Sequence, residues 1–365
     1  MIVSSRKEDH IRLAAEQQGN PAPRAYDDVS FIHHALDGIN RDQVCIETRV
    51  GPLTFGAPFY VNGMTGGTET ALTINRNLAI ATASAGIAMA SGSVGIALDY
   101  PETAASFTVI RDENPDGIVF ANIGAGRSLD DAKRAVDLLS ADGLQLHVNA
   151  VQETIMPEGD RDFSTWLTLI EQIVAGLDVP VIIKEVGAGL SAKTLLALRD
   201  VGVQFVDVAG TGGTDFGKIE NSRRDGGHDD YSFLHGYGNT AVQCLLDALS
   251  AGLIGEETDS NDLTVLSSGG VRHPLDVVKS LALGARAVGV AGSFLTVALN
   301  EGPEAMTEAL EAWKSRLGEL LALLGVTAPS QMAYTDILIR GESRDFAEVR
   351  GIDLAGLARR SQERK

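Results

Sequence analysis

The chain has 365 residues, of which 44% are hydrophobic and 40 are glycine, and it carries a net charge of −19. This acidic balance excludes a large surface for the phosphate backbone of nucleic acid, which needs clustered Lys and Arg. The hydrophobic fraction predicts a globular core, and the length fits one large α/β barrel with appendages. Cys45 and Cys244 form neither a metal-spaced motif nor a disulfide framework, which favours a reducing cytoplasm.

Two segments bear on whether the chain meets a membrane. Four charged residues, 6–9, follow Ser5 directly and leave no apolar stretch for a secretion signal, so we expect a cytoplasmic protein. The uncharged run 77–98 is long enough for a transmembrane helix, but it is mostly small residues without aromatic or basic belts. We therefore predict a buried helix that turns into a buried strand, and no membrane partner.

A basic motif lies close to the N-terminus. Residues 5–8 have the spacing of a capping box, which predicts that a helix begins with Ser5 as its cap. Arg6, Lys7 and His10 would then gather near the positive end of that helix, an arrangement that suits a phosphate group. The alternative is a solvated, charged terminus. The apolar residues expected to pack beneath the helix are Ile11, Leu13 and Ala14.

From residue 56 a short apolar run, a turn and a longer helix-like segment alternate eight times. The strand candidates are Pro58 to Asn62, Gly86 to Ala90, Gly117 to Ala121, Gly143 to Val148, Pro180 to Glu185, Val203 to Ala209, Thr264 to Ser267 and Ala287 to Val290. Eight such units predict a TIM (β/α)8 barrel, with its ligand site at the C-terminal ends of the strands. The predicted organisation is an N-terminal extension that closes over substrate (1–55), the barrel (56–300, with a lid-like insertion at 210–238) and a C-terminal helical segment (301–365).

Four polar residues crowd the end of the fourth predicted strand: His147, Asn149, Gln152 and Glu153. A strand buried on both faces should be nearly all apolar, and an unpaired buried polar group costs roughly 1 to 3 kcal/mol. These side chains either satisfy one another and the neighbouring backbone, or they form a ligand site. Four of them together favour the ligand site.

The fifth predicted strand ends in Lys184 and Glu185, which strand alternation sends to opposite sides. We expect Lys184 to face the barrel interior. A lone lysine at a barrel mouth can be a Schiff-base nucleophile or a fixed cation beside an anion, and the residues alone do not distinguish the two.

Glycine-rich or small polar turns follow the other strands. The positions expected to meet a ligand are Gly63, Met64, Thr65, Ser93, Asn122, Thr214, Gly269, Gly270, Arg272, Ala291 and Gly292. Glycine loops after the last strands of such a barrel commonly bind phosphate at a helix N-terminus, so they indicate a phosphate-bearing cofactor. The segment 187–189 begins like a dinucleotide fingerprint but lacks the third glycine, and we reject a Rossmann interpretation.

Residues 215–236 form a polar insertion that is too long for an ordinary βα turn. His228 and the neighbouring aspartates resemble metal ligands, but a solvated loop or lid is the favoured interpretation. Near the C-terminus, 304–324 reads as an amphipathic helix, and the remaining tail is expected to pack outside the barrel or against another subunit.

Together these motifs resemble the type 2 isopentenyl diphosphate isomerases, a flavin-dependent family, nearly end to end. The residues that carry the resemblance are Arg6-Lys7-x-x-His10, Met64-Thr65-Gly66-Gly67, Ser93, Asn122, His147-x-Asn149-x-x-Gln152-Glu153, Lys184-Glu185-Val186-Gly187, Gly212-Gly213-Thr214, Ser268-Gly269-Gly270-Val271-Arg272 and Ala291-Gly292. The basic N-terminal motif combined with Gln152-Glu153 is the specific part. The chain departs from the family at Val94-Gly95, where a polar or basic residue is common, and at Asp215-Phe216.

The resemblance implies reversible isomerisation of isopentenyl diphosphate to dimethylallyl diphosphate, with reduced FMN as acid/base, NADPH as its reductant and Mg2+ on the diphosphate. It assigns substrate binding to Arg6, Lys7, His10 and Gln152, and it implies that Gln152, which would lie against the reacting carbons, His147 and Asn149 are the catalytic residues. Glu153 would bind Mg2+. The implied FMN ligands are the glycine-loop positions above and Lys184, which would stabilise negative charge on the flavin. The resemblance also implies a homo-oligomer, a tetramer or octamer.

Other classes were weighed on the same residues. A 2-hydroxy acid oxidase needs a His base followed closely by an Arg near a late strand end, and no such pair occurs. An IMP dehydrogenase needs a nucleophilic cysteine after the sixth strand, where Gly210 to Thr214 offers none. A flavin-binding protein without chemistry remains an alternative, because the same glycine loops would serve it.

Overall fold

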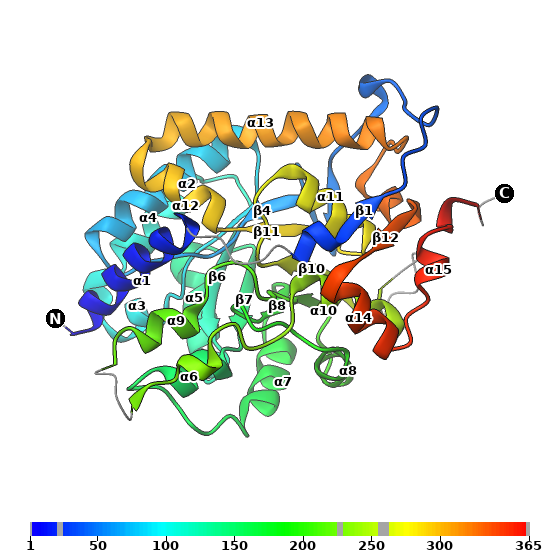
Figure 1. The fold of residues 1–365 in the computed structure, drawn as a ribbon. Helices are drawn as coiled ribbons and strands as arrows, with labels where there is room; N and C mark the ends of the chain where they lie inside the picture. The colour runs from blue at the N-terminus through cyan, green and yellow to red at the C-terminus, as the bar shows by residue number, and fades with distance from the viewer. Residues whose placement is uncertain (1, 20–24, 225–228, 255–262, 363–365) are drawn as a thin grey trace.

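A closed barrel of eight parallel strands forms the centre of the molecule, here a computed structural model that describes residues 2–19, 25–224, 229–254 and 263–362 (Figure 1). Around the barrel the strands follow the order β10-β11-β4-β5-β6-β7-β8-β9. Their bounds are β4 Phe59–Val61, β5 Met89–Ala90, β6 Val119–Gly124, β7 Gly143–His147, β8 Val181–Lys184, β9 Phe205–Asp207, β10 Thr264–Ser268 and β11 Val288–Val290. The predicted TIM barrel is confirmed, and each predicted strand overlaps an observed one.

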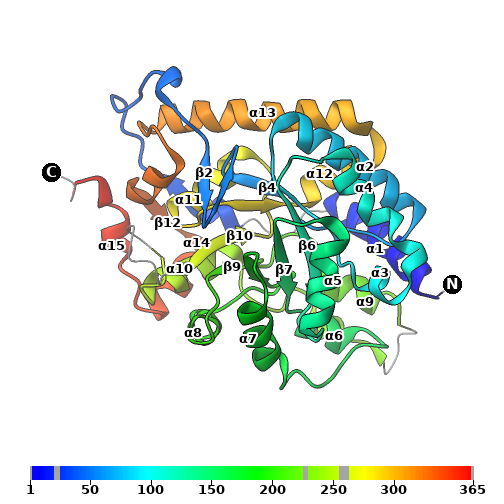
Figure 2. The same ribbon diagram turned by 180° about the vertical axis from the view of Figure 1, so that it is seen from behind.

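Helices surround the barrel (Figures 1 and 2). The α-helices are α1 Ile2–Gly19, α2 Glu69–Ala85, α3 Gly95–Asp99, α4 Ala105–Glu113, α5 Leu129–Leu139, α6 Ala150–Ile155, α7 Trp166–Gly176, α8 Ala192–Asp200, α9 Phe216–Asn221, α10 Ala241–Ser250, α11 Pro274–Ala282, α12 Gly292–Asn300, α13 Gly302–Leu323, α14 Gly341–Val349 and α15 Leu354–Leu357. Short 3-10 helices are η1 Ala25–Asp28, η2 Arg41–Gln43, η3 Pro101–Thr103, η5 Ser232–Leu234, η6 Pro329–Tyr334 and η7 Arg360–Gln362.

Hydroxyl side chains fix where several barrel helices begin. Thr68, Ser128 and Ser191 each accept a hydrogen bond from the backbone N–H three residues further on, and thereby cap α2, α5 and α8. Thr240 and Gln243 form a full capping box at α10. Such caps satisfy N–H groups that a helix leaves unpaired, and they define where these four helices begin.

The strands carry two kinds of surface, because successive side chains point to opposite faces. Outward residues such as Val61, Ile123 and Ile183 join the apolar layer beneath the helices. Inward residues near the N-terminal ends of the strands form a second, smaller apolar cluster that contains Phe120 and Phe205. The interior is therefore packed at one end and open to a site at the other.

A hairpin closes the packed end of the barrel. Its strands are β2 Thr48–Val50 and β3 Leu53–Phe55, which pair antiparallel (Figure 2). Val50 and Phe55 belong to the interior apolar cluster, and Phe55 packs edge-on against Tyr60. Gly51 turns the hairpin at φ +57°, where a Cβ would lie 2.4 Å from the Phe205 ring, so glycine is required here.

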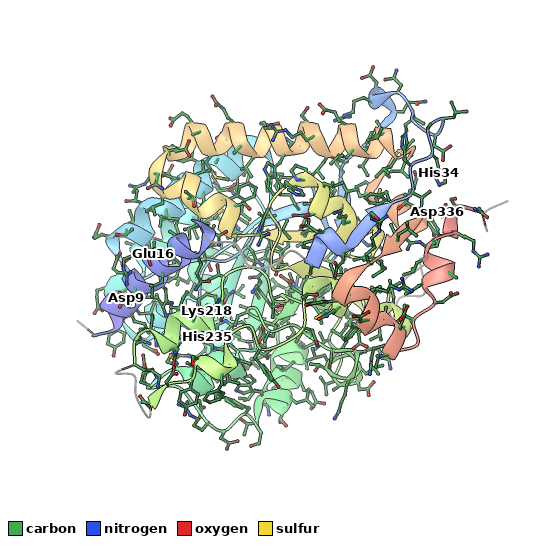
Figure 3. All side chains as sticks on the ribbon, in the orientation of Figure 1. Asp9, Glu16, His34, Lys218, His235 and Asp336 are labelled. Atoms are coloured by element: carbon green, nitrogen blue, oxygen red, sulfur yellow. The ribbon has the colours of Figure 1, made fainter. Side chains whose placement is uncertain are left out.

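A segment that follows α1 pairs with a segment near the C-terminus on the outside of the barrel. Strand β1, Val29–Phe31, pairs antiparallel with β12, Ile337–Ile339. Close by, His34 Nε2 lies 3.0 Å from Asp336 Oδ2 (Figure 3). Further along, Arg350, which follows α14, donates to Asp247 Oδ1 of α10 at 2.9 Å and 2.6 Å. The C-terminal segment thus packs on the barrel's own helices.

Two helix predictions near the termini differ in outcome. Helix α13 runs Gly302–Leu323, close to the predicted 304–324. The predicted start at Ser5 is wrong, because α1 already begins at Ile2 and Ser5 lies inside the helix. A capping residue must have non-helical backbone, so the capping box of residues 5–8 is not used. Ile11 and Ala14 are buried and Leu13 is partly buried, as expected.

The uncharged run 77–98 covers the end of α2, strand β5 and the start of α3, which confirms the predicted buried helix followed by a buried strand. Across the described residues no helix has both the length and the apolar character to span a bilayer. Helix α2 packs instead against α4 and α13.

Candidate active site

A cavity of about 580 Å³ opens at the C-terminal ends of the barrel strands. Many of the predicted site residues line it together: Arg6, Lys7, His10, Gly63, Met64, Ser93, Asn122, His147, Asn149, Gln152, Glu153 and Lys184. The predicted residues outside its lining are Thr65, Thr214, Gly269, Gly270, Arg272, Ala291 and Gly292. The fold therefore brings residues more than 170 positions apart in sequence, from Arg6 to Lys184, around one cavity.

Lys184 stands at the end of β8 and faces the barrel interior, while Glu185 turns away. The Lys184 ammonium donates to the Glu185 carbonyl oxygen at 2.7 Å. Burial lowers the pKa of Lys184, and the negative charges of Asp207 and Glu185 oppose that shift. Glu185 Oε2 accepts the backbone N–H groups of the loop that follows, residues 186–189. One residue therefore presents a cation to the cavity and the next fixes the loop beside it.

His147 ends β7 and contacts Asn122 of the neighbouring strand, with 2.8 Å between Nδ1 and Oδ1. Burial lowers the pKa of His147 to about 3, and the positive charges of Lys184 and Lys7 act in the same direction. The imidazole is therefore neutral at physiological pH. A neutral ring donates from one nitrogen and accepts at the other, so this histidine serves as a hydrogen-bonding group rather than a cation.

Helix α6 places Gln152 and Glu153 at the cavity wall. Asn149, just before the helix, donates to Gln152 Oε1 at 3.2 Å and to Glu153 Oε1 at 3.0 Å. The other oxygen of Glu153 accepts from the backbone N–H of Asp160 at 2.8 Å. Gln152 Nε2 donates to Glu220 Oε1 at 2.8 Å. The amide and the carboxylate are thus held in fixed orientations from both sides.

Helix α1 packs against α9 and α12 (Figure 1), and its residues Arg6, Lys7 and His10 line the cavity. Arg6 forms an ion pair with Glu158 at 3.2 Å, and His10 Nε2 lies 3.0 Å from Glu220 Oε1. Burial lowers the pKa of Lys7 to about 8, with the charge of Arg6 adding to the shift and that of Glu220 opposing it. The three basic side chains therefore line the same cavity as the residues at the strand ends.

Gln17 fastens the same helix to the loop after β9. Its side chain accepts from the Asp215 N–H at 2.7 Å and donates to the Asp215 carbonyl oxygen at 3.1 Å. The next residue, Phe216, lines the cavity and meets the His10 ring edge-on at 5.9 Å. The N-terminal segment is thus a docked helix, and the solvated terminus weighed as an alternative is wrong for residues 6–18.

The insertion after β9 is partly helical. It contains α9, whose Asp215 cap accepts from the Lys218 N–H, and η5 (Figure 3 labels Lys218 and His235). Asp229 pairs with Arg224, and Asp230 accepts from Asn221 at 2.8 Å. His228 lies outside the described residues. Among the residues that are described, no group of three or more His, Cys, Asp or Glu side chains could hold a metal ion.

The glycine loops form a tight cluster beside the cavity. Gly269 and Gly270 have φ of +99° and +73°, and a Cβ on Gly269 would lie 2.0 Å from the Gly210 carbonyl oxygen. Gly292 begins α12, and a Cβ there would lie 2.4 Å from the Gln18 side chain. The Thr65 hydroxyl is buried and, within the described part of the chain, has no hydrogen-bond partner. The glycine loops leave space that side chains would otherwise occupy, and the Thr65 hydroxyl is a buried donor. Both features fit a bound cofactor that carries a phosphate, such as FMN.

An inward-facing layer of polar side chains, which was not predicted from the sequence, lies directly below the cavity. Its centre is Asp207 of β9, which is fully buried and accepts from Tyr60 at 2.7 Å, Asn62 at 3.1 Å and Ser268 at 2.8 Å. Gln145 is also fully buried and joins the layer. A signal existed, since an acid within the apolar run 203–209 is as anomalous as His147 in its own strand.

Further cavity residues had no such signal. Arg127 lines the cavity, pairs with both oxygens of Asp99 at 2.8 Å and 2.5 Å, and lies against Gly95, whose Cβ would be 3.3 Å from Nη2. Trp166 lines the wall as well. These residues come from loops and helix ends whose convergence no local pattern predicts. Glu220, equally unpredicted, lies inside the segment interpreted as a lid.

The fold and the site define a barrel enzyme of the FMN-dependent type. Residues 144–338 match the family described as "FMN-dependent dehydrogenase". Solved structures of similar fold include a flavocytochrome b2 variant with sulfite bound, at TM-score 0.62, 20% identity, and coverage of 90% of this chain and 76% of that one. Mandelate oxidase with (S)-2-phenylpropionate is another, at TM-score 0.62, 17% identity and coverage of 92% and 98%. These likenesses establish the fold alone.

Nearly full-length relatives identify the particular family. Isopentenyl-diphosphate delta-isomerase of Streptomyces sp. (strain CL190) is 49% identical over 362 residues, which cover 99% of this chain and 96% of the relative. The isomerase of Nocardia farcinica (strain IFM 10152) is 47% identical and covers 99% and 97%. The chain belongs to the isopentenyl-diphosphate delta-isomerase family, as the resemblance of its motifs indicated, and it is an FMN-dependent enzyme.

Proposed function

We propose that this enzyme interconverts isopentenyl diphosphate and dimethylallyl diphosphate by a 1,3-proton shift, with reduced FMN, Mg2+ and NADPH as flavin reductant. The observation that carries the proposal is the shared cavity, where the cations of α1 face Gln152, Glu153 and Lys184. A diphosphate would meet Arg6, Lys7 and His10, and its hydrocarbon end would extend toward the barrel. The family membership supplies the reaction.

The FMN ligands in this proposal lie at or after the ends of the barrel strands. The full set is Gly63, Met64, Thr65, Ser93, Asn122, Lys184, Thr214, Gly269, Gly270, Arg272, Ala291 and Gly292. Reduced FMN, when bound, would supply the acid/base chemistry that an unactivated alkene requires. This division suits the residues present, because the neutral side chains Gln152, Asn149 and His147 are poor proton donors at neutral pH. Their role is to orient the reacting carbons and exclude water.

Lys184 would act as a fixed cation rather than a Schiff-base nucleophile. Burial lowers the pKa of Lys184, but Asp207 and Glu185 oppose that shift, and the ammonium donates to the Glu185 carbonyl oxygen. A nucleophilic lysine needs the neutral amine, which a nearby carboxylate opposes. The charge would instead stabilise the anionic reduced flavin.

Glu153 would hold Mg2+ together with the substrate diphosphate. A single carboxylate is consistent with this metal, which keeps several waters and shares substrate phosphates instead of using a full set of protein ligands. Glu153 lines the cavity on the side where α1 lies, and Asn149 and the Asp160 N–H orient its two oxygens. Metal and basic side chains would then neutralise the diphosphate from two directions.

The test is an absorption spectrum of the purified protein, followed by an anaerobic assay with isopentenyl diphosphate, FMN, NADPH and Mg2+. We expect a flavin spectrum and formation of dimethylallyl diphosphate only after the flavin has been reduced. A protein that takes up no FMN would contradict the proposal. Bound flavin without turnover would favour the alternative of a non-catalytic flavin protein. Size-exclusion chromatography with light scattering would test the predicted homo-oligomer.

A further inference from the structure

A continuous chain of side-chain hydrogen bonds runs under the cavity from Asp207 to His147. Asn62 Nδ2 donates to Asp207 Oδ2 at 3.1 Å, and Gln145 Nε2 donates to Asn62 Oδ1 at 3.1 Å. Asn122 Nδ2 donates to Gln145 Oε1 at 3.1 Å, and Asn122 Oδ1 lies 2.8 Å from His147 Nδ1. We call Asn62, Gln145 and Asn122 the amide relay. Its three members come from β6, β7 and the loop residue that follows β4, and all are buried.

Asp207 sets the direction of the relay, because a carboxylate at its end only accepts. Its oxygens already receive the Tyr60 hydroxyl, the Ser268 hydroxyl and the Ala209 N–H. Asn62 must therefore turn its NH2 group toward Asp207, and its oxygen toward the relay. The Gly63 N–H donates to that same oxygen at 2.9 Å, in agreement with this orientation. Gln145 and Asn122 repeat this orientation, since each donates its NH2 group to the amide oxygen of the preceding member.

The relay ends with an oxygen at His147. Since Asn122 uses its NH2 group on Gln145, only its Oδ1 is left for the histidine, and Nδ1 must carry the proton. A neutral imidazole then has its lone pair on Nε2. That nitrogen lies beside Gly124, where a Cβ would be 3.3 Å away, and both residues line the cavity. The glycine keeps the accepting nitrogen uncovered.

We propose that Asp207 is a positioning residue: through the amide relay it holds the proton of His147 on Nδ1, so that Nε2 is presented to the cavity as a hydrogen-bond acceptor. The burial that keeps the ring neutral is a separate condition for the same result. The use of Nε2 rests on the proposed function, in which Nε2 would accept a hydrogen bond from bound cofactor or substrate. The tautomer of His147 does not depend on that function.

The geometry also explains why a charged residue occupies the barrel interior. A buried carboxylate served only by neutral donors is costly, and Lys184, its register partner on β8, supplies the compensating charge. A neutral residue at position 207 would avoid that cost but would no longer force its neighbours to donate. Asp207 is therefore better explained as a directing group than as packing.

The experiment measures the tautomer directly by 15N NMR of the full chain labelled at histidine. The seven histidines are separated by assigning His147 as the signal lost in His147→Gln. In the unaltered protein we expect the proton on Nδ1. In Asp207→Asn the ratio of the two tautomers should move toward Nε2–H by roughly two- to tenfold, the equivalent of one net hydrogen bond.

Three further variants make the result decisive. Tyr60→Phe removes one donor to Asp207 but leaves the relay intact, and should keep the tautomer. Gln145→Met interrupts the relay without altering charge and should reproduce the tautomer shift of Asp207→Asn. It therefore keeps the test available if Asp207→Asn fails to fold. Adding Asn122→Asp to Asp207→Asn places a pure acceptor at His147 and should return the proton to Nδ1.

A proton on Nε2 in the unaltered protein, or an unchanged tautomer in both Asp207→Asn and Gln145→Met, would overturn the proposal. Because no isopentenyl diphosphate is present, failure of the isomerase assay would leave this result standing.

Discussion

The two halves of the cavity are held by different forces. On the barrel side, Lys184, His147 and Asn122 stand on neighbouring hydrogen-bonded strands, and their partners are buried. On the cover side, Arg6, Lys7 and His10 belong to a helix outside the barrel. That helix is attached by the Gln17 contacts, by a small apolar face and by ion pairs that reach solvent. Exposed ion pairs contribute roughly 0 to 1 kcal/mol each, so the cover should respond to charge and pH where the barrel does not.

The largest effect should come from deleting residues 1–10. Each charge-assisted hydrogen bond to phosphate is worth roughly 1.5 to 3 kcal/mol, and a single Arg6→Ala or Lys7→Ala should weaken substrate binding about ten- to a hundredfold. Loss of both should lower kcat/KM by at least about a hundredfold. FMN content should stay normal, because the barrel half is untouched. Steady-state kinetics and flavin content are the measurements.

A matched control for that deletion lies on the same helix. Arg12 is exposed and pairs with Asp9 and Glu16, on the outer side of α1 (Figure 3 labels the two acids). Arg12→Ala removes a basic residue without touching the cavity and should leave KM unchanged. A KM in the deletion equal to that of the intact chain would show that α1 carries no substrate-binding function.

Lys184→Met changes the barrel side of the cavity and should affect FMN binding, whereas the deletion of residues 1–10 should affect substrate binding. Removing the buried cation should weaken FMN binding about ten- to a hundredfold, if it makes one charge-assisted contact with the flavin. The exposed Lys193→Met on α8 is the control and should bind FMN normally. Fluorescence titration of the apoprotein with FMN gives both affinities. Equal affinities would remove Lys184 from the cofactor site and erase the contrast between the two halves.

The sequence was most informative where local patterns reflect the fold. Short apolar runs that alternate with turns and helix-like segments predicted all eight barrel strands, because a buried parallel strand must be apolar and is bounded by turns. The boundaries drifted where apolar residues extend beyond the ladder, as at Gly86, which is the left-handed end of α2 and not part of β5. The β1–β12 pairing escaped prediction, since it joins segments about 300 residues apart.

The site residues also divide into those with a local sequence signal and those without one. His147, Gln152 and Lys184 were predicted because a polar residue at the end of an apolar strand is locally anomalous. Glu220 and Arg127 were missed because their importance arises from contacts with distant segments, such as the α1 side chains that meet Glu220. Asp207 had the same local signal as His147, but it falls inside the predicted strand 203–209, whereas the observed strand β9 ends at Asp207.

A smaller effect is expected for Glu153→Gln, which removes one carboxylate charge and keeps the shape. A hard cation prefers the carboxylate, so the Mg2+ concentration for half-maximal activity should rise by about tenfold or more while FMN stays bound. Glu171→Gln, an exposed acid on α7, is the control for lost negative charge. The measurement is a Mg2+ titration beside flavin content. Unchanged Mg2+ dependence would show that Glu153 is not the ligand.

The last expected effect, which appears only above about pH 8, concerns substrate binding by the α1 side chains. Lys7 has a pKa of about 8, because burial and the neighbouring Arg6 disfavour its charge. Its ammonium is present below that pH and lost above it, so diphosphate affinity should fall as pH rises. Because kcat/KM reports the free enzyme, it should decline above about pH 8, approaching a tenfold loss per pH unit. Bound diphosphate favours the charged lysine, so kcat should hold to higher pH.

Lys7→Arg separates this interpretation from a general alkaline loss of activity. A guanidinium stays charged at every pH of the assay, so the decline in kcat/KM near pH 8 should disappear even if the maximal value drops. FMN affinity, which belongs to the barrel half, should show the same pH profile in both proteins. A break near pH 8 that survives Lys7→Arg would assign the titration to another group. A matching break in FMN affinity would mean that the two halves of the site are not independent.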